Sequence, residues 1–564
     1  MAPGSAPLLA CLFTWMVAGL SGCHFAISAP AYPVSMLVGS ALGGFCRSAA
    51  GAIERRRPRL RDGTVVSLHC RDAGSGDVVQ EMESLARDVL SGRMPPNDGR
   101  IPTLLSVDGE LYQQQLRDRL LQLDPSRTLI PAVTDAPALA SSPMVFMTTP
   151  ALARGLERLA DPFTALTSAT THRQLDPGAP EQPVRFVQTA PTRSNSGLQT
   201  LVAQFVAVSG VRPEQFTLAQ VEAYAGKVAA IHRHITRYGS STNQLAQAMV
   251  RNGPYWASIG SVYESSVINA NLGRAPGEEA WVAVYPRATF TSTMRAILPT
   301  APWIDAKEKE AAGVIIQELL TPEIQRLAAE KGLRPANPAV PASLVTRANG
   351  VDPRARFDSL RSPRPQVVEA MLRSWVAVAK KPSRVALVVD SSGSMQGNKL
   401  PAVQASLSRY LNQLTPRDSV ALFDFDSTLR PPVVVDGQPG SRARGQAFIA
   451  SLQADGGTRL YDAVLQARDW LRLHRRPGEI DAVVVLTDGM DQGSRTSLQA
   501  LQAELRRSGF SGDERIGVFT VGFGANGDFD ASVLKGIATS NGGDFAQGTP
   551  DSIRKLMDDL QLSF

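Results

Sequence analysis

Short apolar runs alternate with longer amphipathic stretches over the first 330 residues. The apolar runs predict β-strands, which we expect at 34–41, 65–70, 103–107, 144–147, 184–188, 266–268 and 281–285. The amphipathic stretches predict helices at 78–90, 218–235, 242–250 and 306–331. Pro322 should break the last helix and Gly332 should cap its end. Strands separated by helices indicate an α/β fold, with parallel sheets covered on both faces.

The same alternation returns after a proline-rich segment. Prolines recur between 335 and 365 with little periodicity, which is typical of a semi-rigid connector, and a helix is expected at 367–378. Further strands are expected at 384–390, 420–426, 481–487 and 516–523, the second of them at a sheet edge. Helices are expected at 401–414, from 460 onward, at 497–507 and at 552–560. A chain of 564 residues is long enough for two or more domains. We place the boundaries at 30–340, 341–380 and 381–564.

Composition and charge indicate a globular protein. Apolar residues make up 43% of the chain, charged residues 20%, and the formal net charge is +6. The basic residues cluster only at 55–61, without interleaved aromatic residues. We interpret that run as a solvated helix end, with a membrane or nucleic-acid patch as the alternative. No nucleic-acid partner is expected.

The N-terminus has the pattern of an export signal. Residues 8–22 are apolar and rich in small side chains, and Leu20-Ser21-Gly22-Cys23 resembles a bacterial lipobox. That resemblance implies that residues 1–23 are a signal peptide whose Cys23 is lipidated, so that the mature protein is anchored to a membrane in the periplasm or at the cell surface. No Lys or Arg precedes the apolar run, which leaves an uncleaved anchor open.

Two cysteines remain outside the signal. Cys46 and Cys70 can form a disulfide in an oxidising compartment, or they can be two separate buried thiols. His232 and His234 are two positions apart on a predicted helix and cannot share a face. We therefore expect both histidines at the surface and not in a metal site.

Three segments in the last third of the chain carry side-chain oxygens that could bind a metal. Asp390-Ser391-Ser392-Gly393-Ser394 follows one buried strand, Asp488 follows another, and Thr458 precedes a helix. Because ligands bind at the carboxyl ends of strands in open α/β sheets, we expect these side chains to meet. Two further acids, Asp424 and Asp426, are expected to be solvated residues at the end of a strand, with an approach to this site as the alternative.

This combination resembles the metal-ion-dependent adhesion site of von Willebrand factor A domains. The resemblance covers about 180 residues and implies a doubly wound, Rossmann-like parallel sheet. It implies that a divalent cation, Mg²⁺ or alternatively Mn²⁺ or Ca²⁺, is held by Asp390, Ser392, Ser394, Thr458 and Asp488. Few carboxylates and several neutral hydroxyls give an incomplete shell, which an Asp or Glu of a protein partner can fill.

Residues from about 34 to 338 resemble a type-2 periplasmic solute-binding protein with two lobes. The matching segments are Pro191-Thr192-Arg193-Ser194-Asn195-Ser196-Gly197, Trp303 to Lys307, Thr321-Pro322-Glu323 and Gly332 to Pro335. Turns rich in Gly and Ser before helices can hold a small anion or a polar solute. Asp72, Asp77 and Glu264 argue against an anion, and helix capping is the alternative role for the turns. The candidate ligand residues are Ser40, Ser75, Arg193, Ser194, Asn195 and Ser196.

Two functions remain after these observations. The first is a non-enzymatic, extracytoplasmic binding protein that recognises another protein through a bound metal. The alternative is a solute receptor or transport-associated protein whose N-terminal cleft binds a small anion or polar solute. An enzyme is not expected, because the sequence has no Gly-Lys-Ser/Thr phosphate loop and no Gly-x-Ser-x-Gly elbow.

Overall fold

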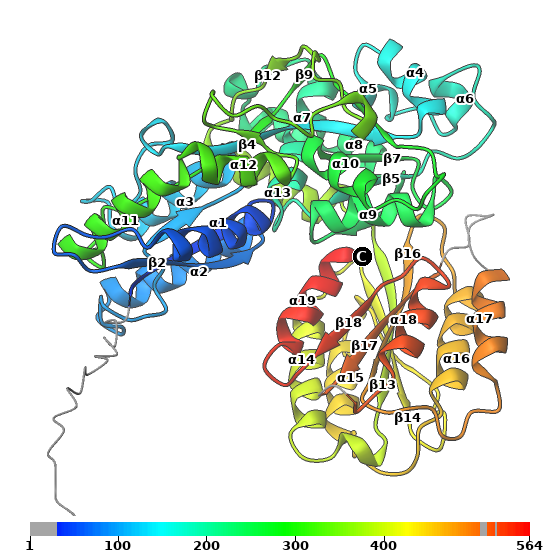
Figure 1. The fold of residues 1–564 in the computed structure, drawn as a ribbon. Coiled ribbons are helices and arrows are strands. Elements are labelled where there is room, and N and C mark those ends of the chain that lie inside the picture. Colours follow the sequence, from blue (N-terminus) through cyan, green and yellow to red (C-terminus); the bar gives the residue numbers. More distant parts are fainter. Residues whose placement is uncertain (1–30, 508–515, 525–526) are drawn as a thin grey trace, which may run out of the picture.

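The computed structural model describes residues 31–507, 516–524 and 527–564, which form a two-lobed first unit and a C-terminal unit (Figure 1). The predicted export segment, with Cys23, lies outside the described residues. Within the described ranges, no helix combines the length and the hydrophobicity needed to cross a bilayer.

The first lobe is built on a small parallel sheet with the strand order β2-β1-β3. Its strands are β1 (Tyr32–Gly39), β2 (Val66–Ala73) and β3 (Leu104–Ser106). The helices around this sheet are α1 (Gly43–Arg56), α2 (Ser75–Leu90), α3 (Glu110–Leu123), α11 (Ala306–Leu319) and α12 (Pro322–Glu330). As predicted, the long C-terminal helical segment breaks at Pro322, and Gly332 follows it with a φ of 74°.

The second lobe contains a mixed sheet with the order β10-β4-β7-β5-β6, and β8 and β11 also pair with β4. β4 runs antiparallel to β7, β8, β10 and β11, so the expectation of a purely parallel sheet was wrong here. β8 and β10 do not pair with each other; they follow one another along β4, β10 opposite Ala138–Pro143 and β8 opposite Phe146–Thr148. The strands are β4 (Ala138–Thr148), β5 (Phe186–Thr189), β6 (Ile235–Gly239), β7 (Ile259–Tyr263), β8 (Val282–Val284), β9 (Ala288–Thr289), β10 (Thr291–Arg295) and β11 (Arg334–Pro335).

Two predictions in this lobe were wrong. The segment 266–268 belongs to α10 (Glu264–Leu272), because a short apolar run does not distinguish a strand from a buried helix. His232 is buried at the end of α8 (Leu218–His232), where its Nδ1 lies 2.8 Å from the Tyr238 hydroxyl and its Nε2 lies 3.0 Å from Gln204 Oε1. The two partners satisfy both ring nitrogens inside the core. The remaining longer helices of the lobe are α4 (Pro150–Arg158), α7 (Asn195–Ser209) and α9 (Thr242–Asn252).

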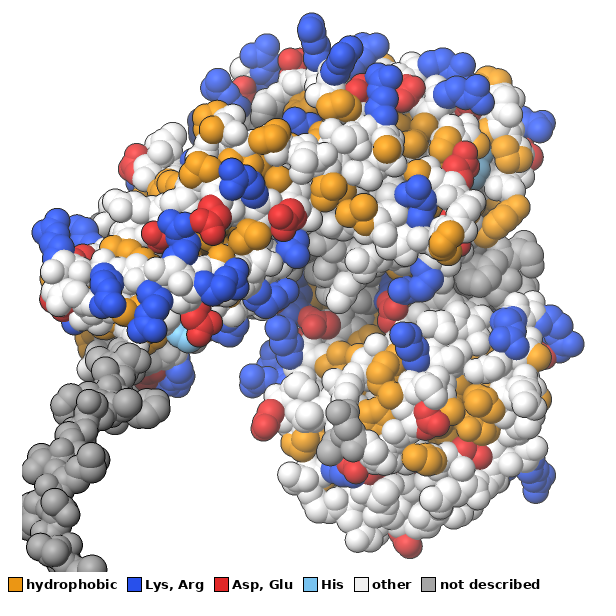
Figure 2. Space-filling view, in the orientation of Figure 1, with side chains coloured by type: hydrophobic (Ala, Val, Ile, Leu, Met, Phe, Trp, Pro, Cys, Tyr) orange, Lys and Arg blue, Asp and Glu red, His pale blue; other side chains and the backbone are white. Residues whose placement is uncertain are grey.

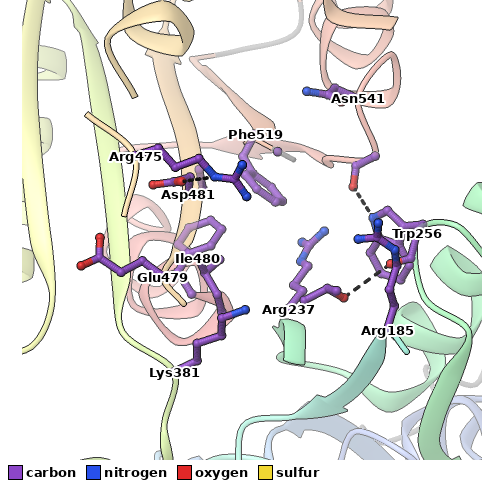
Figure 3. A pocket seen from close by; sticks show the side chains of 15 residues that line it. Arg185, Arg237, Trp256, Lys381, Arg475, Glu479, Ile480, Asp481, Phe519 and Asn541 are labelled. Atoms are coloured by element: carbon purple, nitrogen blue, oxygen red, sulfur yellow. Dashed lines mark hydrogen bonds and ion pairs between the residues drawn. The ribbon is translucent and has the colours of Figure 1, made fainter. Parts of the chain in front are cut away.

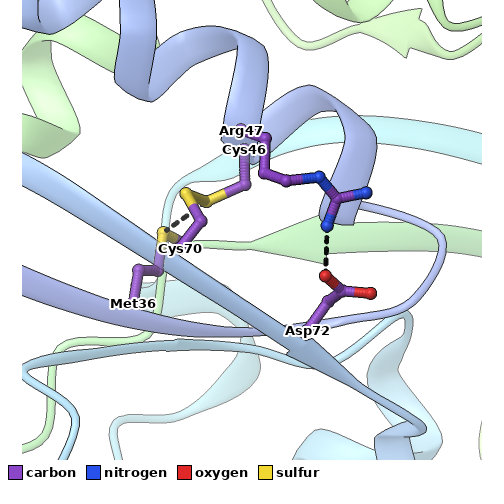
Figure 4. Close-up of a disulfide and its surroundings, with 5 residues drawn as sticks. All are labelled: Met36, Cys46, Arg47, Cys70 and Asp72. Atoms are coloured by element: carbon purple, nitrogen blue, oxygen red, sulfur yellow. Dashed lines mark hydrogen bonds and ion pairs between the residues drawn. A yellow bond between two sulfur atoms is a disulfide. The ribbon is translucent and has the colours of Figure 1, made fainter. Parts of the chain in front are cut away.

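A disulfide joins Cys46 of α1 to Cys70 of β2 (Figure 4), so the two cysteines are not separate thiols. The bond closes a loop with a sequence separation of 24 residues and fixes the first helix on the sheet. Cys46 is buried beside Met36 of β1, at the centre of the first lobe.

The basic run follows the end of α1. Arg57 is the left-handed C-cap of this helix, and Arg56 forms ion pairs with Glu318 of α11 and Glu323 of α12. On the face seen in Figure 2, Lys and Arg side chains are interspersed with acidic and uncharged ones over both units. These contacts agree with the interpretation of the run as a solvated helix end.

The proline-rich connector packs against the second lobe. β11 pairs with β4, β12 (Asp358–Ser359) pairs with β9, and Val340, Val345 and Val351 are buried. The chain continues into α13 (Pro365–Ser374) and a wider helical turn, Trp375–Ala379. The buried ring of Trp375 meets the ring of Tyr238 edge-on at 5.4 Å between centroids. The connector is therefore part of the packed body and not a free spacer.

The C-terminal unit is a six-stranded sheet with the order β15-β14-β13-β16-β17-β18. Every pair is parallel except β14 with β15, and β15 occupies the edge where we had expected β14. Its strands are β13 (Ser383–Asp390), β14 (Ser419–Phe425), β15 (Val433–Val435), β16 (Ile480–Thr487), β17 (Ile516–Phe523) and β18 (Phe545–Gly548). Apolar clusters place α14 (Lys399–Gln413), α15 (Ser441–Ser451) and α19 (Ile553–Ser563) on one face, and α16 (Leu460–Leu473), α17 (Leu498–Arg507) and α18 (Ala531–Thr539) on the other.

The two units meet at the amino edge of the C-terminal sheet. Asp544, just before β18, forms ion pairs with Arg237 at 3.2 Å and Arg251 at 2.9 Å. The indole N–H of Trp256 donates to the Gly542 carbonyl at 3.1 Å, and Arg193 of the first unit pairs with Asp559 of α19. The carboxyl edge of the same sheet lies at the opposite end of the strands, away from the first unit (Figure 1).

Candidate functional site

The five predicted metal ligands lie on three neighbouring segments at the carboxyl edge of the C-terminal sheet. Asp390 ends β13, and Ser392 and Ser394 follow it in the loop before α14. β13 and β16 are adjacent and parallel, so Asp488, just after β16, comes to the same edge. Thr458 lies in the loop that leads into α16.

Asp390 is the most enclosed acid of the group. Its side chain is fully buried, and its two oxygens accept hydrogen bonds from the Ser392 backbone N–H at 2.9 Å and from the Thr487 hydroxyl. Burial raises the pKa of Asp390 to about 6, partly offset by these hydrogen bonds. A carboxylate with this much desolvation gains strongly from a nearby positive charge.

A short chain of hydrogen bonds connects the other candidate ligands. The hydroxyl oxygens of Ser392 and Ser394 are 3.0 Å apart, and Ser394 donates to Asp488 Oδ1 at 2.7 Å. Thr458 is buried and lies near Ser394. A Cβ atom placed at Gly489 would be 3.2 Å from Thr458 Oγ1 and 3.5 Å from Ser394 Oγ, so both hydroxyls border this glycine. The structure thus brings all five side chains to one place.

Backbone hydrogen bonds hold the loops in register. Ser391 N–H donates to the Phe425 carbonyl at 2.9 Å, and Asp455 N–H donates to the Ser391 carbonyl at 2.9 Å. Gly393 N–H donates to the Gly456 carbonyl at 3.0 Å, so the serine loop and the threonine loop are tied directly together. Such fixed loops position the side-chain oxygens without relying on the cation.

The donor set fits a hard divalent cation. It offers two carboxylates and three neutral hydroxyls, all oxygen, which suits Mg²⁺ or Mn²⁺ better than a thiophilic metal. The absence of a side chain at Gly489 leaves space beside two of the hydroxyls. Elsewhere in the described ranges, no three His, Cys, Asp or Glu side chains come together as a metal site.

Sequence reasoning missed three side chains that contact the site. Lys399, the first residue of α14, places its ammonium 2.7 Å from Asp488 Oδ2 and 3.3 Å from Asp528 Oδ2. Thr487 donates to Asp390, as described above. A Lys at the start of the helix after an Asp-x-Ser-x-Ser loop is a detectable signal, whereas the approach of Asp528 depends on tertiary structure.

Asp424 and Asp426 are engaged with other groups and are not solvated strand-end acids. Ser391 donates to Asp424 Oδ1, and Arg430 pairs with Asp424 at 2.7 Å and with Asp426 at 2.6 Å. Burial raises the pKa of Asp424. Burial is also the largest single influence on Asp426, but the hydrogen bonds from Arg430 and Thr428 together outweigh it and lower the pKa of Asp426. Asp424 thus contacts the serine loop through Ser391, whereas Asp426 binds Thr428 and Arg430.

Most of the candidate solute residues of the first unit form hydrogen bonds with other groups of the protein. Ser75 accepts the backbone N–H of Asp108 at 3.0 Å, and Asn195 Nδ2 donates to the Asp108 carbonyl at 3.1 Å. Ser196 lies 3.1 Å from Ser194 Oγ, and all three serine and asparagine side chains of this loop are buried. Ser40 lies in the half-exposed turn after β1.

Two charged residues lie at the loops that were predicted to bind a small anion or a polar solute. Arg193 is held by Asp77 at 2.6 Å and by Asp559. Asp108, which sequence reasoning missed, packs its carboxylate against Gly39 and accepts the Ala41 N–H at 3.3 Å; its burial raises its pKa to about 7. Arg193 is thus paired within the protein, while Asp108 Oδ1 and Asn195 Oδ1 are buried acceptors without a donor among the described residues. An arrangement of paired cations and unpaired acceptors does not favour an anion there.

Comparison with family models gives two matches. Residues 46–334 match the model of the bacterial extracellular solute-binding protein, and residues 385–490 match that of the von Willebrand factor type A domain. The second match spans Asp390, Thr458 and Asp488.

Individual relatives resemble one unit or the other. Human inter-alpha-trypsin inhibitor heavy chain H4 is 32% identical over 169 residues, which is 29% of this chain and 18% of that protein. The chain therefore spans less than a fifth of this relative's length. A von Willebrand factor type A protein from Catenulispora acidiphila aligns with 20% identity and a TM-score of 0.28, over 33% of this chain and 43% of its own. The sulfate-binding protein SubI from Mycobacterium tuberculosis H37Rv aligns with 16% identity and a TM-score of 0.38, over 61% and 97%.

Proposed function

Because the chain belongs to the bacterial extracellular solute-binding protein family and ends in a von Willebrand factor type A domain, we propose that it is a non-enzymatic, exported binding protein. Its C-terminal site binds Mg²⁺ or a similar divalent cation and recognises a carboxylate of a protein partner. The convergence of Asp390, Ser392, Ser394, Thr458 and Asp488 at one sheet edge carries this proposal.

The position of the site supports a role in recognition. The eight-residue strand β13 runs from the amino edge, where the units meet, to the carboxyl edge that bears the site. At about 3.3 Å per residue, the site lies roughly 25 Å from that contact. A partner can therefore approach the carboxyl edge without displacing the first unit.

The residues around the site determine what it can bind. Five protein oxygens would leave one position of a six-coordinate shell open for a further oxygen ligand. Because three of the five are neutral hydroxyls, much of the positive charge of the cation would remain to attract that ligand. Asp390 and Asp488 are anchored by Thr487, Ser394 and Lys399, so their oxygens stay in place when a partner carboxylate arrives. We expect the first unit to hold the C-terminal unit in place, so that the metal site faces the partner.

The test uses Mn²⁺ as the probe. Bound Mn²⁺ enhances water-proton relaxation while water occupies its open position, and a carboxylate that enters the shell lowers the enhancement. We expect acetate to lower it and acetamide, which has the same shape and no charge, to leave it unchanged. EDTA should abolish the signal. A full-length protein that shows no Mn²⁺ enhancement, or an enhancement that acetate does not alter, would contradict the proposed recognition.

Membrane anchoring stays a separate prediction. Membership of an extracellular family fits export, and Cys23 is our candidate for the lipid attachment. Mass spectrometry of the protein from a bacterial membrane fraction should find the acyl chains on Cys23, and replacing Cys23 with Ser should release the protein from that fraction.

A further inference from the structure

The carboxyl edge of the C-terminal sheet carries far more acidic than basic side chains. Five segments lie at this edge: 390–399, 424–430, 455–462, 488–495 and 527–530. They contain nine acids and four bases, namely Asp390, Asp424, Asp426, Asp455, Asp462, Asp488, Asp491, Asp528 and Asp530 against Lys399, Arg430, Arg459 and Arg495. The chain as a whole has a formal net charge of +6, so negative charge is concentrated at this edge.

Direct contacts gather these segments around the candidate metal site. The contacts that connect them are the N–H of Gly393 to the carbonyl of Gly456 at 3.0 Å, the N–H of Arg459 to the carbonyl of Asp426 at 3.1 Å, the N–H of Tyr461 to Asp491 Oδ1 at 3.2 Å, and Lys399 to Asp528 at 3.3 Å. A partner that reaches the metal therefore meets the charges of all five segments.

The excess of acids does not depend on which side chains are paired. Arg430 pairs with both Asp424 and Asp426, and Arg459 pairs with Asp462. Every base of the five segments is already counted against the acids, and the acids still exceed the bases by five. A bound dication would offset only two of these negative charges, so the edge stays negative around it.

Asp455 carries part of this charge at the rim of the site. Its N–H donates to the Ser391 carbonyl at 2.9 Å, which places it beside the serine loop. The side chain is exposed, and its Oδ1 accepts the Gly456 N–H at 2.7 Å. Because Asp455 is not a candidate metal ligand, its charge can be changed without removing an oxygen from the cation.

The amino edge of the same sheet is covered by the first unit. Side chains of both units line a cavity there, with Arg237 and Trp256 on one side and Arg475 and Asp481 on the other (Figure 3). Arg237 pairs with Asp544 at 3.2 Å, and Arg475 lies 3.9 Å from Asp481. Intramolecular contacts thus occupy the amino edge, whereas the acidic carboxyl edge faces away from the first unit (Figure 1).

We propose that the protein partner presents its carboxylate on a basic segment, with Lys or Arg side chains next to the Asp or Glu that reaches the metal. This inference rests on the proposed metal site and names the class of partner that fits it. The cation attracts the carboxylate, and the surrounding acids attract the flanking bases. A carboxylate within an acidic segment would meet like charge on every side of the cation and would be rejected.

The test uses the full chain loaded with Mn²⁺ and follows water-proton relaxation at low ionic strength. The probes are the capped peptides Lys-Asp-Lys, Gly-Asp-Gly and Glu-Asp-Glu. We expect Lys-Asp-Lys to lower the enhancement at a concentration at least about threefold below that of Gly-Asp-Gly. Glu-Asp-Glu should need the highest concentration, although it carries three carboxylates. The differences should shrink in about 0.5 M KCl, and Lys-Asn-Lys should have no effect.

Variants of one rim acid locate the effect. Asp455→Lys should reduce the preference for Lys-Asp-Lys over Gly-Asp-Gly at least about twofold. Asp455→Asn, which keeps an acceptor for the Gly456 N–H, should change it less in the same direction. Asp436→Lys is the matched control, because Asp436 follows β15 where that strand pairs with the start of β14, at the opposite edge. This variant should keep the full preference.

The outcomes separate this inference from the metal site itself. If acetate lowers the enhancement but the three peptides act at equal concentrations, or Glu-Asp-Glu acts best, the basic partner is excluded and the metal site stands. A response to Lys-Asn-Lys, or a preference that Asp455→Lys leaves intact or that Asp436→Lys reduces equally, also overturns the inference. If acetate and all the peptides have no effect, the proposed recognition fails together with it.

Discussion

Replacing Asp390 with Asn should weaken Mn²⁺ binding by more than about 100-fold, as measured by electron paramagnetic resonance of the free ion. Asp390 is one of the two buried carboxylates among the five candidate ligands, and it is the last residue of the central strand β13. The amide keeps the size of the side chain and can still accept the Ser392 N–H, so the loop should stay in place. What is lost is the negative charge that a dication requires.

The control is Asp551→Asn, which removes the same charge from an exposed position. It should leave the Mn²⁺ affinity unchanged. Equal affinities for wild type and Asp390→Asn would mean that the cation binds elsewhere, and the proposed recognition site would have to be abandoned.

The same substitution should stabilise the protein when the metal is chelated. The pKa of Asp390 is about 6 in the folded protein, against an ordinary value of 3.8, because burial penalises its charged form. The unfolded chain therefore ionises first, and the contribution of Asp390 to stability is present below about pH 4 and is lost as the pH rises through 6. The loss amounts to at most about 3 kcal/mol.

Urea unfolding in EDTA at pH 5 and pH 7.5 measures this effect. Asp390→Asn should have a higher midpoint than wild type at pH 7.5, and the difference should shrink at pH 5. A variant that is less stable than wild type at both pH values would show that the carboxylate is needed for folding. Gain of stability together with loss of metal binding is typical of a residue placed for function.

The candidate metal ligands could be predicted from the sequence because one topological rule brings them together. Asp390 and Asp488 each end an apolar run, and the carboxyl ends of neighbouring parallel strands meet at one edge. The hydrophobic pattern predicts the two buried parallel strands, and the resemblance to von Willebrand factor A domains implies that their ends meet. Local turn chemistry then supplies the two serines.

Other features depend on contacts that no local pattern encodes. The run 266–268 is short and apolar, and tertiary packing makes it helical. His232 looks like a surface residue until Tyr238 and Gln204 are brought to it by the fold. In the same way, Arg193 looks like an anion ligand in the sequence, yet its partners Asp77 and Asp559 lie 116 and more than 300 positions away. Charge pairs across units are the least predictable part of this chain.

Replacing Lys399 with Met should raise the Mn²⁺ affinity by roughly 10–100-fold. The ammonium lies 2.7 Å from Asp488 Oδ2, so a dication that uses this carboxylate shares it with a positive charge. Two unit charges 4 Å apart repel by about 4 kcal/mol at an effective dielectric constant of 20, and solvent screening of the partly exposed Lys399 reduces that value. Met keeps most of the length and the apolar contacts of the side chain and removes only the repulsion.

A substitution of Asp528 should have the opposite effect on the Mn²⁺ affinity. It is the second partner of Lys399, at 3.3 Å, and Asp528→Asn should leave the ammonium more tightly bound to Asp488. The Mn²⁺ affinity should then fall. Lys535→Met, which matches the charge change of Lys399→Met at an exposed site of α18, should have no effect. If Lys399→Met and Asp528→Asn shift the affinity in the same direction, Lys399 does not compete with the cation. If they shift it in opposite directions, Lys399 keeps the site weak enough for its occupancy to follow the surrounding metal concentration.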